Sequence, residues 1–313
     1  MYDSATDPMI PNVNDRSPLV YVIILNYNNL RDTVETIRSV LAMEYDNFRV
    51  LLVENSTDHE IINAIRVQFP GIEILETGRN LGYAGGNNAG ILRAMEREPE
   101  YIFLLNNDIF VEPDALTTLV RELETHRDCA VCQPLVMYSE KPDVVWSAGT
   151  EMYLGYPRLY LKNGSSLPKQ TENPPFGLVG CALLFRASVF GDIGLFDESL
   201  FLMHEETDWC IRAKEVGCSL LVVPAAQVQH KVSATLGSLS APYLYYVARN
   251  WVLVAKEHFT FSRYLYVLLT EFLIRLPYYC YLLFRRGELR KIRFYLSGLR
   301  DGLLGISGEM KLL

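Results

Sequence analysis

The first hundred residues alternate between short apolar runs and stretches with helical periodicity. Apolar runs cover residues 20–25, 49–53, 72–75 and 101–105, and amphipathic stretches separate them. Runs that are apolar on both faces are typical of parallel strands covered by helices on either side. The pattern therefore predicts an α/β domain with a mostly parallel, Rossmann-like sheet and helices on both faces.

Each predicted strand ends in a polar cluster of distinct composition. Because ligands of such sheets collect at the carboxyl ends of the strands, we expect the four clusters to share one rim. The candidate residues are, in chain order, Asn26, Tyr27 and Asn28; Glu54; Asn80, Gly82 and Asn87; and Asn106, Asn107 and Asp108.

Beyond residue 130 the alternation gives way to other strands and loops. A polar segment with several prolines, residues 163–175, indicates a loop that could cover an acceptor site. A compact unit follows, with a strand at 177–185, a helix at about 205–216 and a strand at 219–223. His230 comes a few residues after that last strand.

Charge divides the chain into two unlike parts. The net charge is −8, but residues 242–313 carry 11 Lys/Arg against 5 Asp/Glu, whereas residues 1–241 carry 18 against 32. An acidic body of this kind argues against nucleic-acid binding. With 313 residues, the economical division is a flexible N-terminus (1–18), a catalytic domain (19–241) and a C-terminal helical extension (242–313).

The N-terminus and the cysteines indicate a cytoplasmic protein. Residues 1–18 are polar and contain no apolar core of a secretory signal. The six cysteines lie mostly in apolar surroundings, as buried thiols in a reducing compartment do. Cys129 and Cys132 form an isolated CxxC without a second pair, so we favour core packing over a zinc or redox site.

The extension contains an aromatic and apolar segment at residues 264–284. Glu271, Arg275 and Pro277 interrupt it, which argues against a membrane span and favours a helix lying at a membrane surface. The basic residues after it would face anionic headgroups at the inner face of the plasma membrane. Packing on the domain, or on a second copy in a homo-oligomer, is the alternative interpretation.

Two acidic groups are candidates for chemistry. Asp108 follows a buried strand, which would hold its carboxylate rigidly at the rim, and a hard oxygen ligand suits Mg²⁺ or Mn²⁺. A role as a helix N-cap would explain an aspartate at this position equally well. Glu205 and Glu206 open a predicted helix, where acidic residues are also favoured by the helix dipole. His230 alone is more often structural than a ligand. The glycines around Gly82 fit either a phosphate-binding loop or a tight turn, and their spacing is not GxGxxG.

Together these segments resemble the family-2 inverting glycosyltransferases with the GT-A fold, especially the bacterial rhamnosyltransferase-like branch. The resemblance extends over about residues 19–260 and follows the family's order. Its motifs lie at residues 22–28, 53–58, 80–87, 104–108, Gly180, 196–198, 205–212, His230 and 245–250.

The resemblance implies roles for the donor-side residues. Asn26, Tyr27, Asn28 and Glu54 would hold the nucleotide base, and Asn80, Gly82 and Asn87 would line the nucleotide pocket. Asn106, Asn107 and Asp108 occupy the place of the family's DxD motif, with the neutral Asn106 where many members have a carboxylate. Asp108, with His230, would then bind the metal that bridges the donor diphosphate.

The resemblance also implies the reaction. Glu206 would be the catalytic base and Glu205 the alternative, while Asp208 and Arg212 would brace their helix. The sugar, by analogy rhamnose from a dTDP- or UDP-linked donor, would pass to a glycan or lipid-linked acceptor in cell-envelope synthesis with inversion. A sugar-nucleotide pyrophosphorylase would favour a basic, glycine-rich first loop, which residues 26–29 lack. A degenerate transferase acting as a membrane-complex scaffold remains the non-enzymatic alternative.

Overall fold

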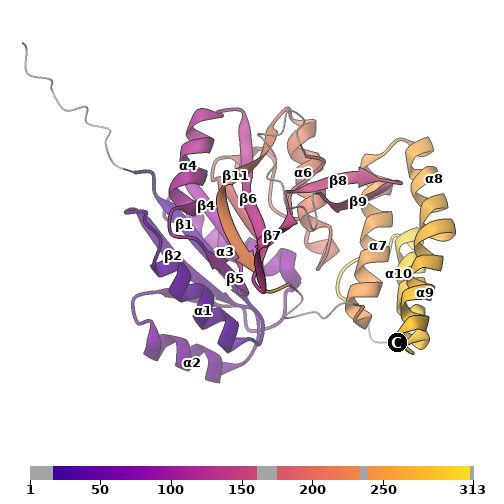
Figure 1. The fold of residues 1–313 in the computed structure, drawn as a ribbon, viewed down its shortest axis with the longest axis horizontal. Helices are drawn as coiled ribbons and strands as arrows, with labels where there is room; N and C mark the ends of the chain where they lie inside the picture. Colours follow the sequence, from indigo (N-terminus) through magenta and orange to yellow (C-terminus); the bar gives the residue numbers. More distant parts are fainter. Residues whose placement is uncertain (1–16, 161–174, 233–238, 311–313) are drawn as a thin grey trace, which may run out of the picture.

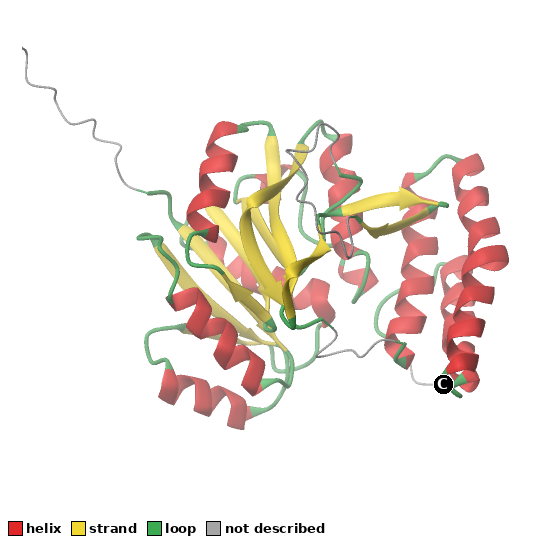
Figure 2. Cartoon of the chain, in the orientation of Figure 1, coloured by secondary structure: helices red, strands yellow, loops and turns green. Residues whose placement is uncertain are grey.

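The computed structural model describes residues 17–160, 175–232 and 239–310, which form a large sheet, a small hairpin and the helices around them (Figures 1 and 2). The strands are β1 (Val20–Asn26), β2 (Phe48–Glu54), β3 (Glu73–Glu76), β4 (Tyr101–Asn106), β5 (Ile109–Val111), β6 (Cys129–Tyr138), β7 (Lys141–Ser147), β8 (Thr150–Tyr153), β9 (Tyr156–Leu159), β10 (Ala182–Arg186) and β11 (Ser219–His230). The α-helices are α1 (Leu30–Leu41), α2 (His59–Gln68), α3 (Gly82–Met95), α4 (Ala115–Thr125), α5 (Val189–Asp192), α6 (Glu205–Glu215), α7 (Ala241–His258), α8 (Phe261–Thr270), α9 (Leu276–Arg285) and α10 (Ile292–Leu304).

The central sheet has the order β3-β2-β1-β4-β10-β6-β11-β5, with β7 paired to β6. Strand β1 is parallel to both β2 and β4, and β10 is antiparallel to β4. In the register of β1 with its neighbours β2 and β4, Asn26 pairs with Glu54 of β2 and Leu25 pairs with Asn106 of β4. The mostly parallel sheet is confirmed, and its three polar strand ends lie at the same level.

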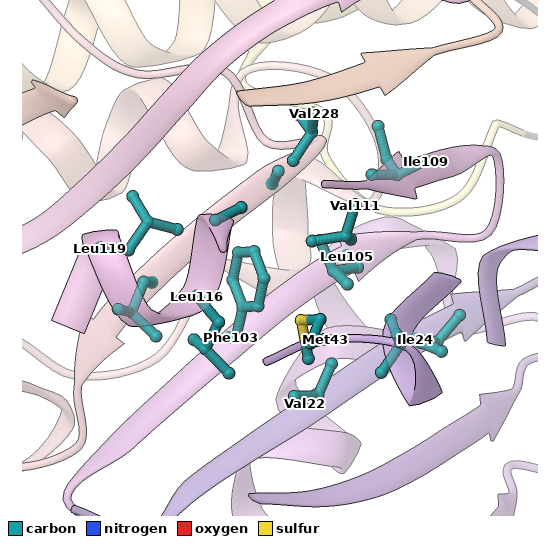
Figure 3. Packing of buried hydrophobic residues seen from close by; sticks show 14 of the residues in the cluster. Val22, Ile24, Met43, Phe103, Leu105, Ile109, Val111, Leu116, Leu119 and Val228 are labelled. Carbon is teal, nitrogen blue, oxygen red and sulfur yellow. The ribbon is translucent and has the colours of Figure 1, made fainter. Parts of the chain in front are cut away.

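Helices α1, α2 and α4 cover one face of the sheet. Their apolar sides meet residues of alternate positions along the strands, such as Val22 and Ile24 of β1 and Phe103 and Leu105 of β4 (Figure 3). These side chains are almost fully buried. Close packing of this kind fixes the strand ends, because a register shift of one residue would turn every side chain to the other face.

Helices α3, α5 and α6 cover the opposite face. The intervening positions of the strands, such as Ile23 of β1 and Leu51 of β2, belong there to a buried cluster that also contains Ile91 of α3 and Trp209 of α6. The amino end of α3 meets the turn before α6, where Ala84 N donates to Phe201 O at 3.2 Å. Cys129 and Cys132 are buried free thiols on β6, which confirms the packing interpretation for these two residues.

The C-terminal helices form a separate layer beside the β8–β9 hairpin (Figure 1). Helix α10 packs closely along α7, and Gly298 allows this approach because a Cβ at this position would lie 2.3 Å from the carbonyl oxygen of Tyr245. The indole Nε1 of Trp251 on α7 donates to the carbonyl of Gly155 in the hairpin, at 2.9 Å. A π-helical turn, Glu271–Arg275, joins α8 to α9. Among the described helices, the joined segment Phe261–Arg285 is long and apolar enough to cross a membrane by length and composition.

Several expected elements have other bounds. The strand expected at 177–185 begins at Ala182, because Phe176 and Gly177 instead bond to the backbone of Thr150. The strand expected to end at 223 continues as β11 to His230, because after an irregularity at Val223 it pairs again with β6 and then with β5. The proposed loop at 163–175 lies almost entirely outside the described residues.

Candidate active site

The ends of β1, β2 and β4 form one hydrogen-bonded rim. The amide Nδ2 of Asn26 donates to Glu54 Oε2 at 2.5 Å, and Asn26 Oδ1 accepts from Asn107 Nδ2 at 2.7 Å. Thr33 Oγ1 of α1 donates to the same Asn26 oxygen at 2.8 Å. Asn26 therefore ties the first, second and fourth polar clusters together, as expected from parallel strands that end side by side.

Glu54 keeps one unsatisfied oxygen at this rim. Its side chain is fully buried, and Oε1 has no hydrogen-bond partner. Burial raises the pKa of this carboxyl, while hydrogen bonds from Ser56 and Asn26 act in the opposite direction. Tyr27, next to Asn26, is 40% exposed and Asn28 adopts a left-handed conformation with φ 53°. A buried polar group with free bonding capacity beside an exposed ring can recognise a planar, hydrogen-bonding ligand.

The third cluster is held by its own side chains. Asn55 Oδ1 accepts from Leu81 N at 3.0 Å, Asn80 Oδ1 accepts from Gly82 N at 2.8 Å, and Asn87 Nδ2 donates to Tyr83 O at 3.0 Å. The glycines here face protein atoms: a Cβ on Gly82 would lie 2.3 Å from the Phe201 carbonyl oxygen. The glycines therefore serve close packing, and a nucleotide contact by Asn80, Gly82 or Asn87 stays a prediction.

Asp108 and His230 face each other at the other end of the rim. Asp108 follows β4 by two residues and His230 is the last residue of β11, rather than a residue beyond it. Asp108 Oδ1 lies 3.2 Å from His230 Nε2, and both residues are 7% exposed. Asp108 Oδ1 and His230 Nδ1 are buried without a hydrogen-bond partner. The ring of Trp146 packs edge-on against the imidazole, with 4.6 Å between centroids.

This pair fits part of the coordination shell of a divalent cation. A carboxylate oxygen suits Mn²⁺ or Mg²⁺, an imidazole nitrogen can add a further bond, and Asp108 Oδ1, which faces His230 Nε2, is a buried oxygen without a hydrogen bond. No group of three or more His, Cys, Asp or Glu side chains able to hold a metal occurs in the described part of the chain. The remaining ligands would therefore have to come from amide oxygens, a substrate or water.

Glu205 and Glu206 begin α6 after a turn with unusual backbone angles. Phe201, Met203 and His204 all have positive φ, between 63° and 72°. Glu206 is half-buried and lines a cavity of about 930 Å³, whereas Glu205 is 4% exposed and its Oε2 has no partner. Burial raises the pKa of Glu206 to about 7 and holds the pKa of Glu205 well above its ordinary value.

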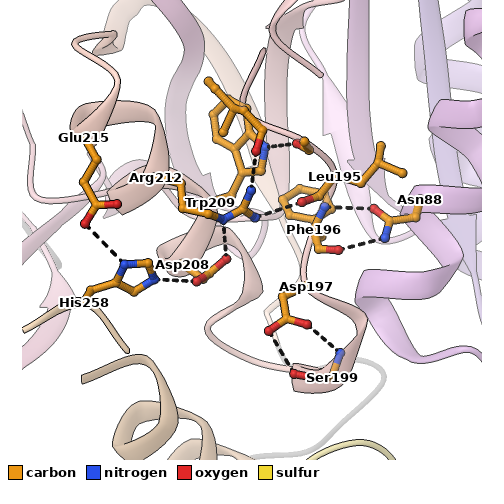
Figure 4. A network of polar contacts seen from close by, with 12 residues as sticks. Asn88, Leu195, Phe196, Asp197, Ser199, Asp208, Trp209, Arg212, Glu215 and His258 are labelled. Carbon is orange, nitrogen blue, oxygen red and sulfur yellow. Dashed lines mark hydrogen bonds and ion pairs between the residues drawn. The ribbon is translucent and has the colours of Figure 1, made fainter. Parts of the chain in front are cut away.

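The next turn of α6 is anchored by a polar network (Figure 4). Asp208 accepts from Arg212 Nε at 2.8 Å and lies 2.7 Å from His258 Nε2 of α7. Arg212 also donates to the carbonyls of Ile193 and Leu195 at 2.8 Å each. Asp208 and Arg212 thus brace the helix, and the adjacent Glu206 is left free to face the cavity.

Helix α7 holds the turn in front of Glu205. The Arg249 guanidinium donates to Leu200 O at 2.8 Å, and Asn250 Nδ2 donates to Met203 O at 2.7 Å. Both side chains are fully buried. From the sequence, residues 245–250 resemble a family motif, but no role could be given to them. The signal that could have indicated a role is the adjacent Arg249 and Asn250 in an otherwise apolar helix, because polar side chains buried there need hydrogen-bond partners.

The segment before β10 contacts the end of the strand that leads to Asp108. Asn106 N donates to Cys181 O at 3.0 Å. Burial raises the pKa of the Cys181 thiol, and the charges of Asp108 and Glu206 add to the increase. Trp146, which packs on His230, also lines the cavity that Glu206 lines. Sequence reasoning missed Trp146 and Cys181, since neither belongs to a polar cluster.

A family model confirms what the motifs suggested. Residues 21–194, more than half of the chain, match the model for "Glycosyl transferase family 2". The chain belongs to glycosyl transferase family 2. The rim with Asn26 and Glu54, and the Asp108 loop, lie within the matched residues, whereas Glu206 and His230 follow them.

Curated relatives of this glycosyltransferase include bacterial rhamnosyltransferases. It is 21% identical to the dTDP-rhamnosyl transferase RfbF of Shigella flexneri over 254 residues, which cover 76% of the chain and 81% of that protein. It is 27% identical to the N-acetylglucosaminyl-diphospho-decaprenol L-rhamnosyltransferase of Mycobacterium tuberculosis over 216 residues, covering 62% and 70%.

Solved structures show the fold of the glycosyltransferase. The mannosyltransferase PcManGT from Pyrobaculum calidifontis, in complex with GDP-Man and Mn²⁺, aligns with a TM-score of 0.57 and 11% identity, over 93% of this chain and 90% of that one. GalNAc-T7, with UDP, GalNAc and Mn²⁺, aligns with a TM-score of 0.62 and 16% identity, over 78% of this chain and 48% of that one. The GT-A fold expected from the motifs is confirmed.

Proposed function

We propose that this glycosyltransferase transfers a hexose, with inversion, from a nucleotide diphosphate donor to a glycan or lipid-linked acceptor of the cell envelope. The proposal rests on one contact: Trp146 packs against His230, the partner of Asp108, and also lines the cavity that Glu206 lines. Asp108 itself lines a second, smaller cavity beside Lys231. The names of the bacterial relatives support rhamnose as the sugar, and the name of RfbF supports dTDP as the nucleotide, with UDP as the alternative nucleotide of the proposal. The lipid-linked acceptor is supported by the name of the mycobacterial relative.

The rim at β1, β2 and β4 is the proposed donor side. Asn26 and Glu54 would bond the nucleotide base through the free Glu54 oxygen, with Tyr27 stacking from the exposed side. Asn28, Asn80, Gly82 and Asn87 would complete the nucleotide pocket. The backbone of this pocket is already fixed by hydrogen bonds within the protein, so the donor would bind without ordering a loop.

Asp108 and His230, assisted by Asn106 and Asn107, would hold a Mg²⁺ or Mn²⁺ ion. The ion would supply positive charge that stabilises the departing diphosphate. The described residues offer no cluster of three ligating side chains, which is in keeping with a cation that also binds substrate phosphates.

Glu206 is the proposed base. It lines the larger cavity, where an acceptor hydroxyl could reach it, and its pKa of about 7 is matched to proton transfer near neutral pH. The hydroxyl oxygen would bond to the anomeric carbon while the bond from that carbon to the diphosphate oxygen breaks, and the Glu206 carboxylate would take the hydroxyl proton. One displacement of this kind inverts the configuration. Glu205, closed off from the cavity, is the less suited alternative.

We further propose the division into residues 1–18, 19–241 and 242–313, and a cytoplasmic location at the inner face of the plasma membrane. The support is the basic extension, with 11 Lys/Arg against 5 Asp/Glu, behind an acidic catalytic body. A role of the extension in forming a homo-oligomer would also be compatible with its exposed apolar residues.

The first test is a thermal-shift screen of the purified protein against dTDP-, UDP- and GDP-sugars with and without Mn²⁺. We expect a metal-dependent stabilisation by one nucleotide, because a ligand that binds only the folded state raises the melting temperature. The nucleotide sugar that stabilises the protein, together with Mn²⁺, is then used in a transfer assay. Absence of any shift from a folded sample would contradict the donor site and favour a non-catalytic scaffold.

A further inference from the structure

The outward side of the segment Phe261–Arg285 carries a continuous row of exposed apolar side chains, which we call the apolar stripe. Its members are between 42% and 70% exposed and recur at helical spacing. They are Leu265, Leu269, Phe272, Leu273, Ile274, Tyr278, Tyr281 and Phe284. A row of this size on a folded chain is typical of a surface that contacts another apolar body.

The two charged residues in the middle of this segment point away from the stripe. Glu271 is fully buried, accepts from the Tyr295 hydroxyl and lies 2.8 Å from Arg275 Nε. The Arg275 guanidinium lies 3.1 Å from the centroid of the Tyr156 ring. From the sequence, these charges interrupt the apolar segment. In the structure they face the protein, so the outward side from Leu265 to Phe284 is uncharged.

The opposite side of the same segment is buried against the rest of the extension. Val267, Tyr279 and Leu283 are at most 7% exposed and pack with residues of α7 and α10. One half of the segment is thus covered by protein and the other half is not. This arrangement fits a helix that lies flat on a surface rather than one surrounded by lipid on all sides.

The stripe continues into the cavity that Glu206 lines. Ile274 and Tyr278 are 44% and 56% exposed on the stripe and also line the cavity. Within the lining, Arg158 is paired with Glu151 at 2.8 Å and Arg275 with Glu271, so Glu206 is the remaining acidic group of the lining that has no basic partner. An otherwise neutral, tyrosine-rich wall suits an uncharged sugar ring, whose apolar face can stack on an aromatic ring.

Basic residues follow the stripe at its C-terminal end. Arg285, Arg290 and Arg293 are exposed, and the whole extension has six more basic than acidic residues. A second copy docked stripe to stripe in parallel would bring these like charges together, whereas acidic lipid headgroups would attract them in any orientation of the stripe. Charge complementarity therefore selects an anionic lipid surface as the occupant of the stripe.

We propose that the apolar stripe docks on an anionic lipid surface and that the cavity takes from this surface an acceptor whose sugar reaches Glu206 while its apolar tail stays in the lipid. The docking follows from the stripe and the basic end of the extension. The identity of the cavity as the acceptor side rests on the proposed function.

Docking is tested by co-sedimentation of the full chain with vesicles of phosphatidylcholine, with and without about one-third phosphatidylglycerol. The variants are Leu273→Asp and Phe284→Asp, which add charge to stripe residues that do not line the cavity. Val67→Asp is the matched control, because Val67 is an 83% exposed apolar residue on α2, far from the extension (Figure 1). We expect wild type and Val67→Asp to bind anionic vesicles, and the two stripe variants to bind about 10-fold less.

Wild-type protein that stays in the supernatant, or stripe variants that bind like wild type, would overturn the docking proposal. Analytical ultracentrifugation of the same samples adds a second criterion. A wild-type dimer that Leu273→Asp converts to a monomer would assign the stripe to a second copy and reject the lipid surface.

The acceptor step is tested with Tyr278→Ala and Tyr278→Phe in a transfer assay with N-acetylglucosaminyl diphosphate on a long polyprenol, presented in anionic vesicles. We expect Tyr278→Ala to raise the KM for this acceptor about 10-fold and Tyr278→Phe to rescue it, with the Kd for the donor nucleotide unchanged in calorimetry. An unchanged acceptor KM in Tyr278→Ala would overturn the acceptor assignment. Loss of donor binding in wild type would instead refute the proposed function and leave the vesicle result standing.

Discussion

The side-chain amide of Asn250 donates to the carbonyl oxygen of Met203 at 2.7 Å, and the same Nδ2 donates to Leu200 and Leu202. Through these bonds a helix of the C-terminal extension holds the turn that aims Glu206 into the cavity. The turn needs this support because three of its residues have positive φ, which costs non-glycine residues about 1–2 kcal/mol each.

We therefore expect Asn250→Ala to lower kcat by about 10- to 100-fold with little change in donor Kd, because the base would lose its fixed position. Lys256→Ala, an exposed substitution on the same helix, is the control. Steady-state kinetics and nucleotide calorimetry measure the two effects. A parallel loss of nucleotide binding and melting temperature would show that Asn250 supports the whole fold rather than the position of Glu206.

Glu206 should set the acidic side of the pH–rate profile. Burial raises its pKa to about 7, and a base works only when deprotonated. We expect kcat/KM to rise about tenfold per pH unit below this value and to level off above it. Glu206→Gln should reduce transfer by roughly 10³-fold or more, and Glu206→Asp should retain part of the rate. A Glu206→Gln enzyme with near-normal turnover would assign the base to another residue.

Glu205 should act on stability rather than on rate. Its folded pKa is raised by burial, so the folded state binds more protons than the unfolded chain above the ordinary pKa of about 4.5. Stability therefore falls as pH rises above that value. Glu205→Gln removes this loss, so its melting temperature relative to wild type should increase from pH 5 to pH 8. A difference that is constant over this range would exclude ionisation of Glu205 as the cause.

The parts of the site that lie at strand ends could be predicted from the sequence. Asn26, Glu54, Asn107 and Asp108 follow apolar runs, and parallel strands must end side by side, so their meeting at one rim needed only the strand pattern. The covering helices were equally predictable, because the alternation of apolar runs and amphipathic stretches has few other solutions.

The acceptor side could not be predicted in this way. The cavity around Glu206 combines Trp146, the β8–β9 hairpin and the helices of the extension, which are far apart in sequence and meet through tertiary packing alone. Likewise, the inward orientation of Glu271 and Arg275 depends on Tyr156 and Tyr295, so a linear pattern shows two charges in an apolar segment without showing which way they face.

Asp108 and His230 should determine the metal requirement. We expect Asp108→Ala to abolish transfer while the fold remains intact, and His230→Ala to raise the Mn²⁺ concentration for half-maximal activity by about 10-fold or more. His59→Ala, an exposed histidine on α2, is the matched control. Metal titrations of transfer, together with Mn²⁺ binding followed by electron paramagnetic resonance in the presence of nucleotide, measure the effect. An unchanged Mn²⁺ titration in His230→Ala would exclude His230 as a metal ligand and leave Asp108 as the proposed ligand.

The turn at Gly82 couples the nucleotide pocket to the turn before Glu205, and a series of three glycine variants can separate the causes. Gly82 has φ +74° and a Cβ there would lie 2.3 Å from the Phe201 carbonyl; Gly78 has φ +69° with open space; Gly71 has open space and no positive φ. We expect Gly71→Ala to be nearly neutral, Gly78→Ala to cost about 1–2 kcal/mol, and Gly82→Ala to cost more and to lower kcat as Phe201 is displaced.

Denaturant unfolding and steady-state kinetics on the same three variants complete this test. The contact of Gly82 with Phe201 predicts that only Gly82→Ala changes kcat, because Ala84 N also donates to Phe201 O, at 3.2 Å, and so links α3 directly to the turn that carries the base. Equal destabilisation of Gly78→Ala and Gly82→Ala would show that backbone conformation alone requires glycine at residue 82. The nucleotide pocket and the turn before Glu205 would then not be coupled at this residue.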